Sequence, residues 1–225
     1  MRKYDLKQLM KQHNIPILYK QKKSSYKYKN KIVPINELDI INGDGLSSLE
    51  TKKLLKASYE PDKLNLEDWL LDSELSDNIN NVFINNKTGQ VVFTIAGTQG
   101  FTDWTNNLTY AVAGNKGYKN TKRYKTAEKV FNKAKKKYGN NIILLGHSQG
   151  ALSASLLAND DDEVITYNRA TSLGVKNVNK NNQTNLSVKG DLVSELNSSG
   201  LDYKKIKTKF INPLKNHSIN RLSKN

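Results

Sequence analysis

The segment Gly146-His147-Ser148-Gln149-Gly150 carries the clearest chemical signal in this chain. Its serine lies between two glycines, each two positions away, so it can occupy a sharp, strained turn that connects a strand to a helix. The apolar run NIILL enters the segment and the small-residue run ALSASLLA leaves it, which is the arrangement that such a turn needs. We interpret Ser148 as a nucleophile; the alternative is a glycine-lined turn whose serine is idle.

A serine hydroxyl is a weak nucleophile and needs a base, normally histidine, to accept its proton. The chain has three histidines, His13, His147 and His217. His13 precedes the expected fold, and the His147 side chain would point away from Ser148 at the turn. His217, in the polar segment NPLKNHSIN, is therefore the predicted base, and a surface histidine near the C-terminus is the alternative.

The base requires an acid that holds its imidazole in the correct tautomer. Asp191 follows NLSVKG and is expected at the carboxyl end of a strand, where the ligand-handling residues of open α/β sheets collect. Glu195 and Asp202 are the fallback candidates. The acidic run 160–163 is expected at the opposite edge of the sheet, as solvated charges.

A reaction of this kind also develops a negative charge on oxygen, which N–H donors must stabilise. We expect one donor to be the backbone amide of Gln149. The segment TIAGTQGFTDW at 94–104 offers the other, because Gly97 permits close approach and Thr98 carries both an amide and a hydroxyl.

The elements that position these residues follow from the hydrophobic pattern. Residues 46–59 are predicted to be helical, with one apolar face made of Leu46, Leu49, Leu54, Leu55 and Tyr59. Residues 122–138 are predicted to form a surface helix that ends at Gly139, with an inner face of Ala127, Val130, Phe131, Ala134 and Tyr138. A third helix is expected at 150–158. Strands are expected at 82–85, 90–96, 141–145, 163–168, 184–189 and 206–211. This order predicts an α/β fold with a mostly parallel central sheet and helices on both faces.

Length and composition limit the number of domains and the kinds of site that this chain can form. A length of 225 residues suits one domain with a modest extension, and the absence of cysteine excludes disulfides, thiol nucleophiles and cysteine-ligated zinc. We expect no cofactor and no metal. We find neither a signal-peptide core nor a membrane-spanning apolar run, so the expected protein is soluble and intracellular.

The net charge of +15 is concentrated at the two ends of the chain. Residues 1–36 contain ten basic residues and one acid, and residues 203–225 contain seven basic residues and none. Such ends favour a phosphate-bearing partner, either an anionic membrane surface or nucleic acid. The alternative is solubility with a lysine-rich coding bias, and nucleic acid is the weaker partner because no known binding module is recognisable.

These motifs together resemble the class 3 lipase family of the α/β-hydrolase superfamily. The resemblance rests on Gly97-Thr98, Asp103-Trp104, the GHSQG segment, GDLV at 190–193 and HSI at 217–219, and it covers roughly residues 45–222 in order. It implies an α/β-hydrolase domain over 41–225, preceded by a basic extension at 1–40.

The resemblance also implies roles for residues that chemistry alone does not assign. Thr98 would be the oxyanion residue, Trp104 would pack beside the site and residues 105–118 would take the place of a lid. Within that segment, Leu108, Tyr110 and Val112 are our candidates for the lining of an acyl pocket. Three departures, namely Ala151 in place of a frequent glycine, the short chain and a less apolar lid segment, argue against long-chain triglyceride. Phospholipid, monoacylglycerol and smaller esters remain. The rival functions are a thioesterase or peptidase on the same triad, and a non-catalytic basic protein that binds anionic membranes or nucleic acid.

Overall fold

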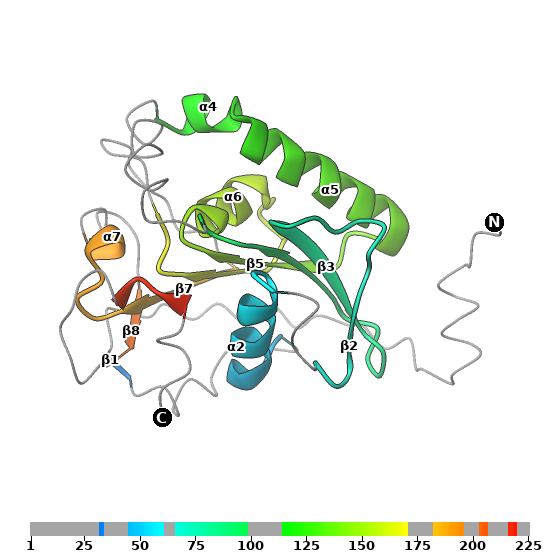
Figure 1. The fold of residues 1–225 in the computed structure, drawn as a ribbon, viewed down its shortest axis with the longest axis horizontal. Helices are drawn as coiled ribbons and strands as arrows, with labels where there is room; N and C mark the ends of the chain where they lie inside the picture. Colours follow the sequence, from blue (N-terminus) through cyan, green and yellow to red (C-terminus); the bar gives the residue numbers. More distant parts are fainter. Residues whose placement is uncertain are drawn as a thin grey trace.

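The computed structural model describes residues 32–33, 45–60, 66–98, 114–170, 182–195, 203–206 and 216–219. In these residues a central sheet is covered by helices on both faces (Figure 1). Its eight strands have the order β1-β8-β7-β6-β5-β4-β3-β2. Neighbours from β1 to β4 pair in parallel, whereas β3 and β2 add an antiparallel edge. The strands are β1 (Ile32–Val33), β2 (Trp69–Leu71), β3 (Asn80–Asn85), β4 (Val91–Ile95), β5 (Ile142–His147), β6 (Val164–Tyr167), β7 (Gln183–Val188) and β8 (Lys204–Ile206).

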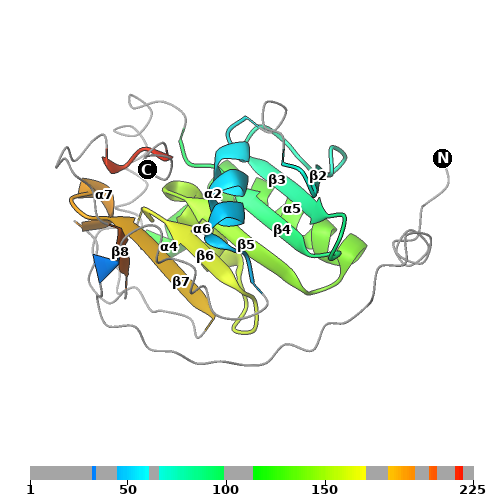
Figure 2. The same cartoon turned by 90° about the horizontal axis from the view of Figure 1, so that it is seen from below.

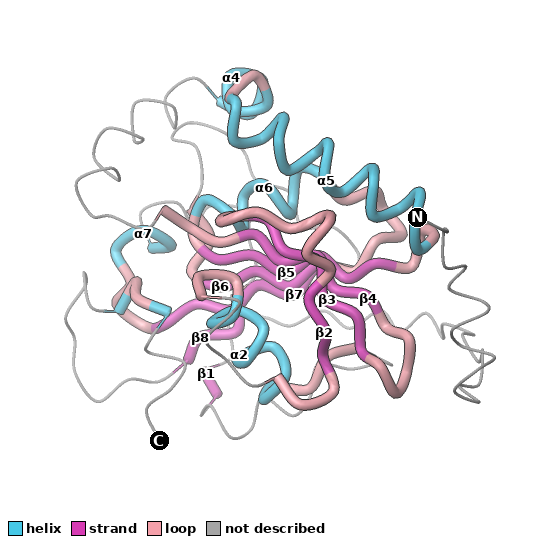
Figure 3. The backbone as a smooth tube through the Cα atoms, turned by 45° about the vertical axis from the view of Figure 1, so that its right-hand side comes forward, coloured by secondary structure: helices cyan, strands magenta, loops and turns pink. Residues whose placement is uncertain are grey.

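The described helices are α2 (Ser48–Ala57), α4 (Gly114–Lys119), α5 (Lys122–Tyr138), α6 (Gln149–Leu157) and α7 (Leu192–Glu195). Helices α5 and α6 form a layer on one side of the sheet and α2 covers the other side (Figure 2 and Figure 3). This arrangement confirms the predicted fold class.

The alternation of side chains along the central strands produces a separate apolar core on each face. Val92 of β4 and Leu145 of β5 belong to the core under α2, which includes Leu54. Their neighbours Phe93 and Leu144 belong to the core under α5 and α6. The central strands are therefore buried on both faces, which accounts for the continuous apolar run in the sequence of β5.

Helix α2 begins at a capping box. The Ser47 hydroxyl accepts a hydrogen bond from the Glu50 amide, while the Glu50 carboxylate accepts one from the Ser47 amide. The prediction of one apolar face over 46–59 is wrong in two places, because the helix ends at Ala57 and Leu49 is 57% exposed. Tyr59 lies just beyond the helix, and its hydroxyl reaches the carboxyl ends of β4 and β5.

Helix α5 has the predicted bounds and the predicted inner face. The Thr121 hydroxyl accepts a hydrogen bond from the Tyr124 amide at its start, and Gly139 ends it with φ of 88°, a backbone angle that favours glycine. Ala127, Phe131 and Ala134 are buried against the sheet. The lysines of the helix lie mostly on its outer face.

Several elements were not predicted. The short strands β1 and β2 and the short helices α4 and α7 lack a long hydrophobic period. Strand β1 lies within the segment expected as a basic extension, yet it pairs with β8. Strand β8 begins at Lys204, two residues before the predicted start, and residues 207–211 lie outside the described residues. None of the described helices is both long and apolar enough to cross a bilayer.

A buried carboxylate fastens the end of α5 to the antiparallel edge of the sheet. Asp72, after β2, accepts hydrogen bonds from Lys137 Nζ at 2.7 Å and from the Tyr138 hydroxyl at 2.6 Å. Burial by itself would raise the pKa of Asp72. The hydrogen bonds from Lys137 and Tyr138, the charge of Lys137 and the hydrogen bond from the Glu74 amide together outweigh burial and hold the pKa below its ordinary value.

We predict that Asp72→Asn lowers the free energy of unfolding by about 1–2 kcal/mol at pH 7. Because the folded-state pKa of Asp72 is depressed, its contribution is complete above the ordinary carboxyl pKa of about 4 and is lost as the pH falls through the folded-state value. Urea unfolding at pH 7 and near pH 2.5 measures this. The two proteins should differ at pH 7 and converge in acid.

Glu74→Gln is the matched control, since Glu74 also contacts Lys137 but its side chain is 82% exposed. Its effect should stay below about 0.5 kcal/mol. An Asp72→Asn variant no less stable than Glu74→Gln at pH 7 would contradict the assignment.

Candidate active site

Ser148 occupies a sharp turn between β5 and α6. Its φ of 54° and ψ of −122° lie in a region that residues other than glycine rarely adopt, so the turn stores backbone strain. Hydrogen bonds hold it there: the Ser148 amide donates to the Tyr167 carbonyl, and the Ser148 carbonyl accepts from the amides of Ala151 and Ala170. The sequence prediction of a strand, turn and helix around Ser148 matches this geometry.

The flanking glycines are required by close packing rather than by their own backbone angles. A Cβ atom at Gly146 would lie 2.6 Å from the Ala151 backbone, and one at Gly150 would lie 2.0 Å from the Ile95 carbonyl oxygen. Neither contact is possible without movement of the main chain. Both glycines therefore let α6 cross close to β4 and β5.

The structure brings Ser148, His217 and Asp191 together from three separate segments. His217 Nε2 lies 2.8 Å from Ser148 Oγ, and His217 Nδ1 lies 2.9 Å from Asp191 Oδ1. Asp191 is fully buried, while the His217 side chain is 19% exposed. The second carboxylate oxygen of Asp191 accepts a hydrogen bond from the Ser194 amide at 3.0 Å, which orients the carboxylate.

The chemistry of the partners indicates where the protons lie. A carboxylate can only accept, so His217 Nδ1 carries hydrogen and donates to Asp191. In the neutral ring, Nε2 is then free to accept the hydrogen bond of the Ser148 hydroxyl. This is the tautomer in which a histidine can take a proton from serine.

Two asparagines that sequence reasoning missed fix the short segment that carries His217. Asn168 Nδ2 donates to the Asn216 carbonyl at 2.9 Å, and Asn168 Oδ1 accepts from the Val188 amide. Asn216 Nδ2 donates to the Lys189 carbonyl at 3.1 Å. Both asparagines are fully buried. In the sequence, only their positions could have indicated this role: Asn168 is the last residue of a predicted strand, and Asn216 directly precedes His217.

Both ring nitrogens of His147 contact groups other than the Ser148 hydroxyl, and its ring is buried. Its Nε2 lies 2.9 Å from the His217 carbonyl oxygen, and its Nδ1 contacts the hydroxyl of Tyr59. Burial, together with the nearby His217, lowers the pKa of His147 to about 3. The ring is therefore neutral at physiological pH.

Of the two predicted oxyanion residues, Gln149 directly follows Ser148, and Thr98 directly follows Gly97, where a Cβ atom would lie 2.9 Å from Ser148 Cβ. Among the described residues, no hydrogen bond involves the Gln149 amide, as expected at the first position of a helix. Thr98 Oγ1 is buried and likewise has no hydrogen-bond partner there. The Gly97 amide, in contrast, already donates to the Tyr59 hydroxyl at 2.7 Å.

Some predicted site residues lie outside the described residues, and the prediction for the acidic run 160–163 is corrected. Trp104, Leu108, Tyr110, Val112 and the fallback acid Asp202 lie outside the described residues, as does the side chain of Glu195. The expectation that the whole acidic run 160–163 is solvated is wrong for Asp162. Its side chain is buried and pairs with Lys135 at 3.2 Å, because that turn packs against α5.

No protein-family model matches the sequence, and no curated protein matches it. Comparison of the fold with solved structures does find matches. They are lipases. The Lip2 lipase from Yarrowia lipolytica is 14% identical, with a TM-score of 0.49 over 72% of this chain and 77% of that one. A fungal lipase in complex with an inhibitor is 13% identical, with a TM-score of 0.44 over 79% and 80% of the two chains. A triacylglycerol lipase from Penicillium expansum is 13% identical, with a TM-score of 0.43 over 71% and 77%. At identities of 13–14% and TM-scores below 0.5, these matches carry no argument about activity. The function of this protein must be argued from the site itself.

We predict that His147 does not titrate between pH 4.5 and 9 and keeps its proton on Nε2, because its ring is buried and its Nε2 faces a carbonyl. Nitrogen-15 NMR of histidine-labelled protein measures this. The chain has three histidines, so His147→Asn and His217→Asn spectra assign the signals.

His13 lies outside the described residues, and its signal is the one that both variants retain. A His147 signal that titrates near the ordinary pKa of about 6.5, or that shows hydrogen on Nδ1, would contradict the described geometry.

Proposed function

We propose that this protein is a serine-dependent hydrolase of acyl esters and that Ser148, His217 and Asp191 form its catalytic triad. The observation that carries the proposal is the pair of contacts made by His217, 2.8 Å to Ser148 Oγ and 2.9 Å to Asp191 Oδ1. The strained turn at Ser148 adds support, since such turns expose a nucleophile at the carboxyl edge of a sheet.

In the first half of the reaction, Ser148 Oγ attacks the ester carbonyl while His217 Nε2 takes the hydroxyl proton. Asp191 stabilises the imidazolium that forms. The carbonyl electron pair moves onto oxygen, and the tetrahedral intermediate collapses as its C–O bond breaks. His217 returns the proton to the departing alcohol, which leaves the acyl group on Ser148.

In the second half, water replaces the alcohol. His217 removes a proton from the water as it attacks the acyl carbonyl, and then protonates Ser148 Oγ as the carboxylic acid departs. In both halves the negative oxygen needs donors. The Gln149 amide and the amide and hydroxyl of Thr98 fit this role, because the described hydrogen bonds commit none of them.

A triad does not determine the acyl carrier. A lipid ester or a small acyl ester agrees best with the resemblance drawn from the sequence motifs, and a thioesterase or peptidase uses the same chemistry. Turnover of matched ester, thioester and amide substrates with graded acyl chains separates these alternatives.

We predict that Ser148→Ala lowers kcat on p-nitrophenyl esters at least about 10³-fold, because the nucleophile is lost. His217→Ala should cost nearly as much. The double variant should be little slower than either single variant, since triad members act as a unit. Steady-state kinetics of the three variants measures this.

Ser155→Ala is the matched control, because Ser155 is a buried serine of α6 whose hydroxyl donates to the Ala151 carbonyl. Its kcat should stay within about threefold of wild type. Ester hydrolysis retained by Ser148→Ala, or multiplicative losses in the double variant, would remove the triad assignment.

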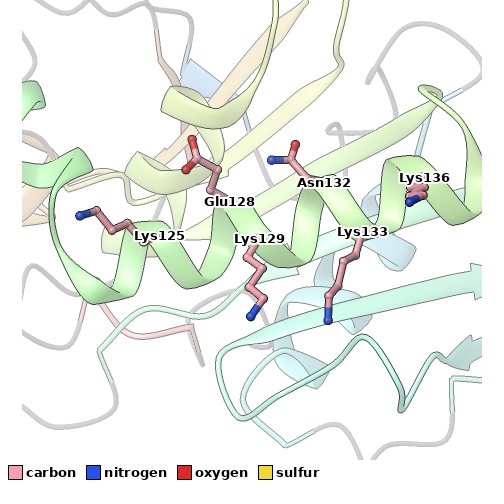
Figure 4. Close-up of a pocket in the computed structure, with 6 residues that line it drawn as sticks. All are labelled: Lys125, Glu128, Lys129, Asn132, Lys133 and Lys136. Atoms are coloured by element: carbon pink, nitrogen blue, oxygen red, sulfur yellow. The ribbon is translucent and has the colours of Figure 1, made fainter.

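We further propose that positive charge draws the enzyme to anionic membrane surfaces. The basic ends of the chain lie outside the described residues, but α5 presents a row of exposed lysines of its own, at positions 122, 125, 129, 133 and 136. At 1.5 Å per residue the row is about 21 Å long. Figure 4 shows four of these lysines lining an open hollow with Glu128 and Asn132. Among the described residues, none of the five forms an ion pair.

We predict that Lys129→Gln with Lys133→Gln weakens binding to vesicles that contain phosphatidylserine, by about fivefold for each lysine removed. Added salt should weaken binding by wild type, and neutral vesicles should show neither effect. Vesicle co-sedimentation measures this.

Lys53→Gln with Lys87→Gln is the control, because it removes the same charge from lysines already paired with Glu67 and Asp68. Equal losses in the two double variants would show that net charge alone acts. Unchanged binding after loss of Lys129 and Lys133 would exclude the lysine row as the contact surface.

A further inference from the structure

Tyr59, which the triad chemistry does not use, lies at the centre of a chain of hydrogen bonds beneath the site. Its hydroxyl accepts from the Gly97 amide at 2.7 Å and contacts Nδ1 of His147. The other ring nitrogen of His147, Nε2, lies 2.9 Å from the His217 carbonyl oxygen. One continuous chain thus joins the loop that carries Thr98 to the segment that carries His217.

The direction of every bond in this chain follows from the partners. A carbonyl can only accept, so His147 Nε2 carries the hydrogen. The neutral ring then has a lone pair on Nδ1, which accepts the hydrogen of the Tyr59 hydroxyl, and the Tyr59 oxygen is left to accept from Gly97. Burial raises the pKa of Tyr59 to about 12, so the phenol keeps its proton.

Three aromatic rings pack around the ring of His147. They belong to Tyr59, just beyond α2, to Tyr167 of β6 and to His217, with ring centroids 5.1–5.8 Å away. The site is equally crowded at Gly97, where a Cβ atom would lie 2.6 Å from the Tyr59 hydroxyl and 2.9 Å from Ser148 Cβ. Glycine at position 97 therefore leaves the space that the Tyr59 hydroxyl needs to bond the Gly97 amide and His147.

We propose that Tyr59 is a positioning residue which, through His147, fixes the Thr98 loop and the His217 segment relative to each other on either side of Ser148. The proposal rests on the proposed function. It adds a coupling between the oxyanion donors and the base, and it assigns the tyrosine that follows α2 a role in the rate of the reaction rather than in substrate binding. A misplacement of about 1 Å in such a site costs on the order of 100-fold in rate.

Tyr59→Phe tests this, because it removes one oxygen atom and leaves the ring in place. We expect kcat on a soluble p-nitrophenyl ester to fall 10- to 100-fold with KM within twofold of wild type. Tyr124→Phe is the matched control: Tyr124 is buried, and its hydroxyl donates to the Leu156 carbonyl. Among the described hydrogen bonds and ring contacts, none joins Tyr124 to Ser148, His217 or Asp191. The kcat of Tyr124→Phe should be unchanged even if its melting temperature falls as far.

A second comparison tests whether the chain of hydrogen bonds from Gly97 to His217 acts as a unit. His147→Asn keeps an acceptor near the Nδ1 position and removes the bond to the His217 carbonyl. If these hydrogen bonds act as a unit, kcat of the Tyr59→Phe/His147→Asn double variant should be little lower than kcat of the slower single variant. Multiplicative losses, a kcat for Tyr59→Phe within twofold of wild type, or equal losses in Tyr59→Phe and Tyr124→Phe would each overturn the proposal.

The NMR signals of His147 separate this proposal from the proposed function. Tyr59→Phe should shift the Nδ1 resonance of His147, which loses its donor, and leave hydrogen on Nε2. If wild type hydrolyses no ester but this shift occurs, the proposed function fails while the connection stands. An unchanged Nδ1 resonance overturns the connection whether or not the protein is active.

Discussion

The strained turn at Ser148 is the constraint on which the site depends. A positive φ at a serine costs free energy, and the surrounding packing must supply it. Parallel pairing of β5 with β4 and β6 fixes the strand that enters the turn, and α6 packs so closely on β4 that Gly150 has no room for a side chain. The sheet and the helix thus hold the Ser148 hydroxyl at the carboxyl edge, within hydrogen-bonding distance of His217.

The remaining groups come from segments far apart in the chain, and buried polar contacts align them with that turn. Asp191 follows β7, and its carboxylate is held by the Ser194 amide and by His217. Asn168 and Asn216 tie the His217 segment to the ends of β6 and β7. His147 extends the same network to the other side of β5. A buried polar group left without a partner is costly, so these contacts also make one arrangement of the site much more favourable than others.

The sequence was sufficient to predict those parts that local chemistry and periodicity specify. The flanking glycines and the apolar run before them indicated the turn at Ser148, and the period of 3.6 gave α5 its bounds and inner face. His217 and Asp191 could be chosen because few histidines and few acids lie at strand ends after Ser148. Tyr59 could not be placed, because its spacing from Leu55 fits a helix face and its true partners are 38 and 88 residues away. Asp162 was misjudged for the same reason, since only the packing of α5 brings Lys135 to it.

The central claim is that His217 and Asp191 make the Ser148 hydroxyl nucleophilic. The most direct measurement is labelling with a fluorophosphonate, followed by mass spectrometry of the digested protein. One adduct is expected, on Ser148, formed rapidly in wild type and much more slowly in Asp191→Asn, whose amide cannot hold the same His217 tautomer. Ser153 and Ser155, in the helix that follows, should stay unmodified. No adduct on folded wild-type protein, an adduct on another serine, or equal rates in wild type and Asp191→Asn would contradict the claim.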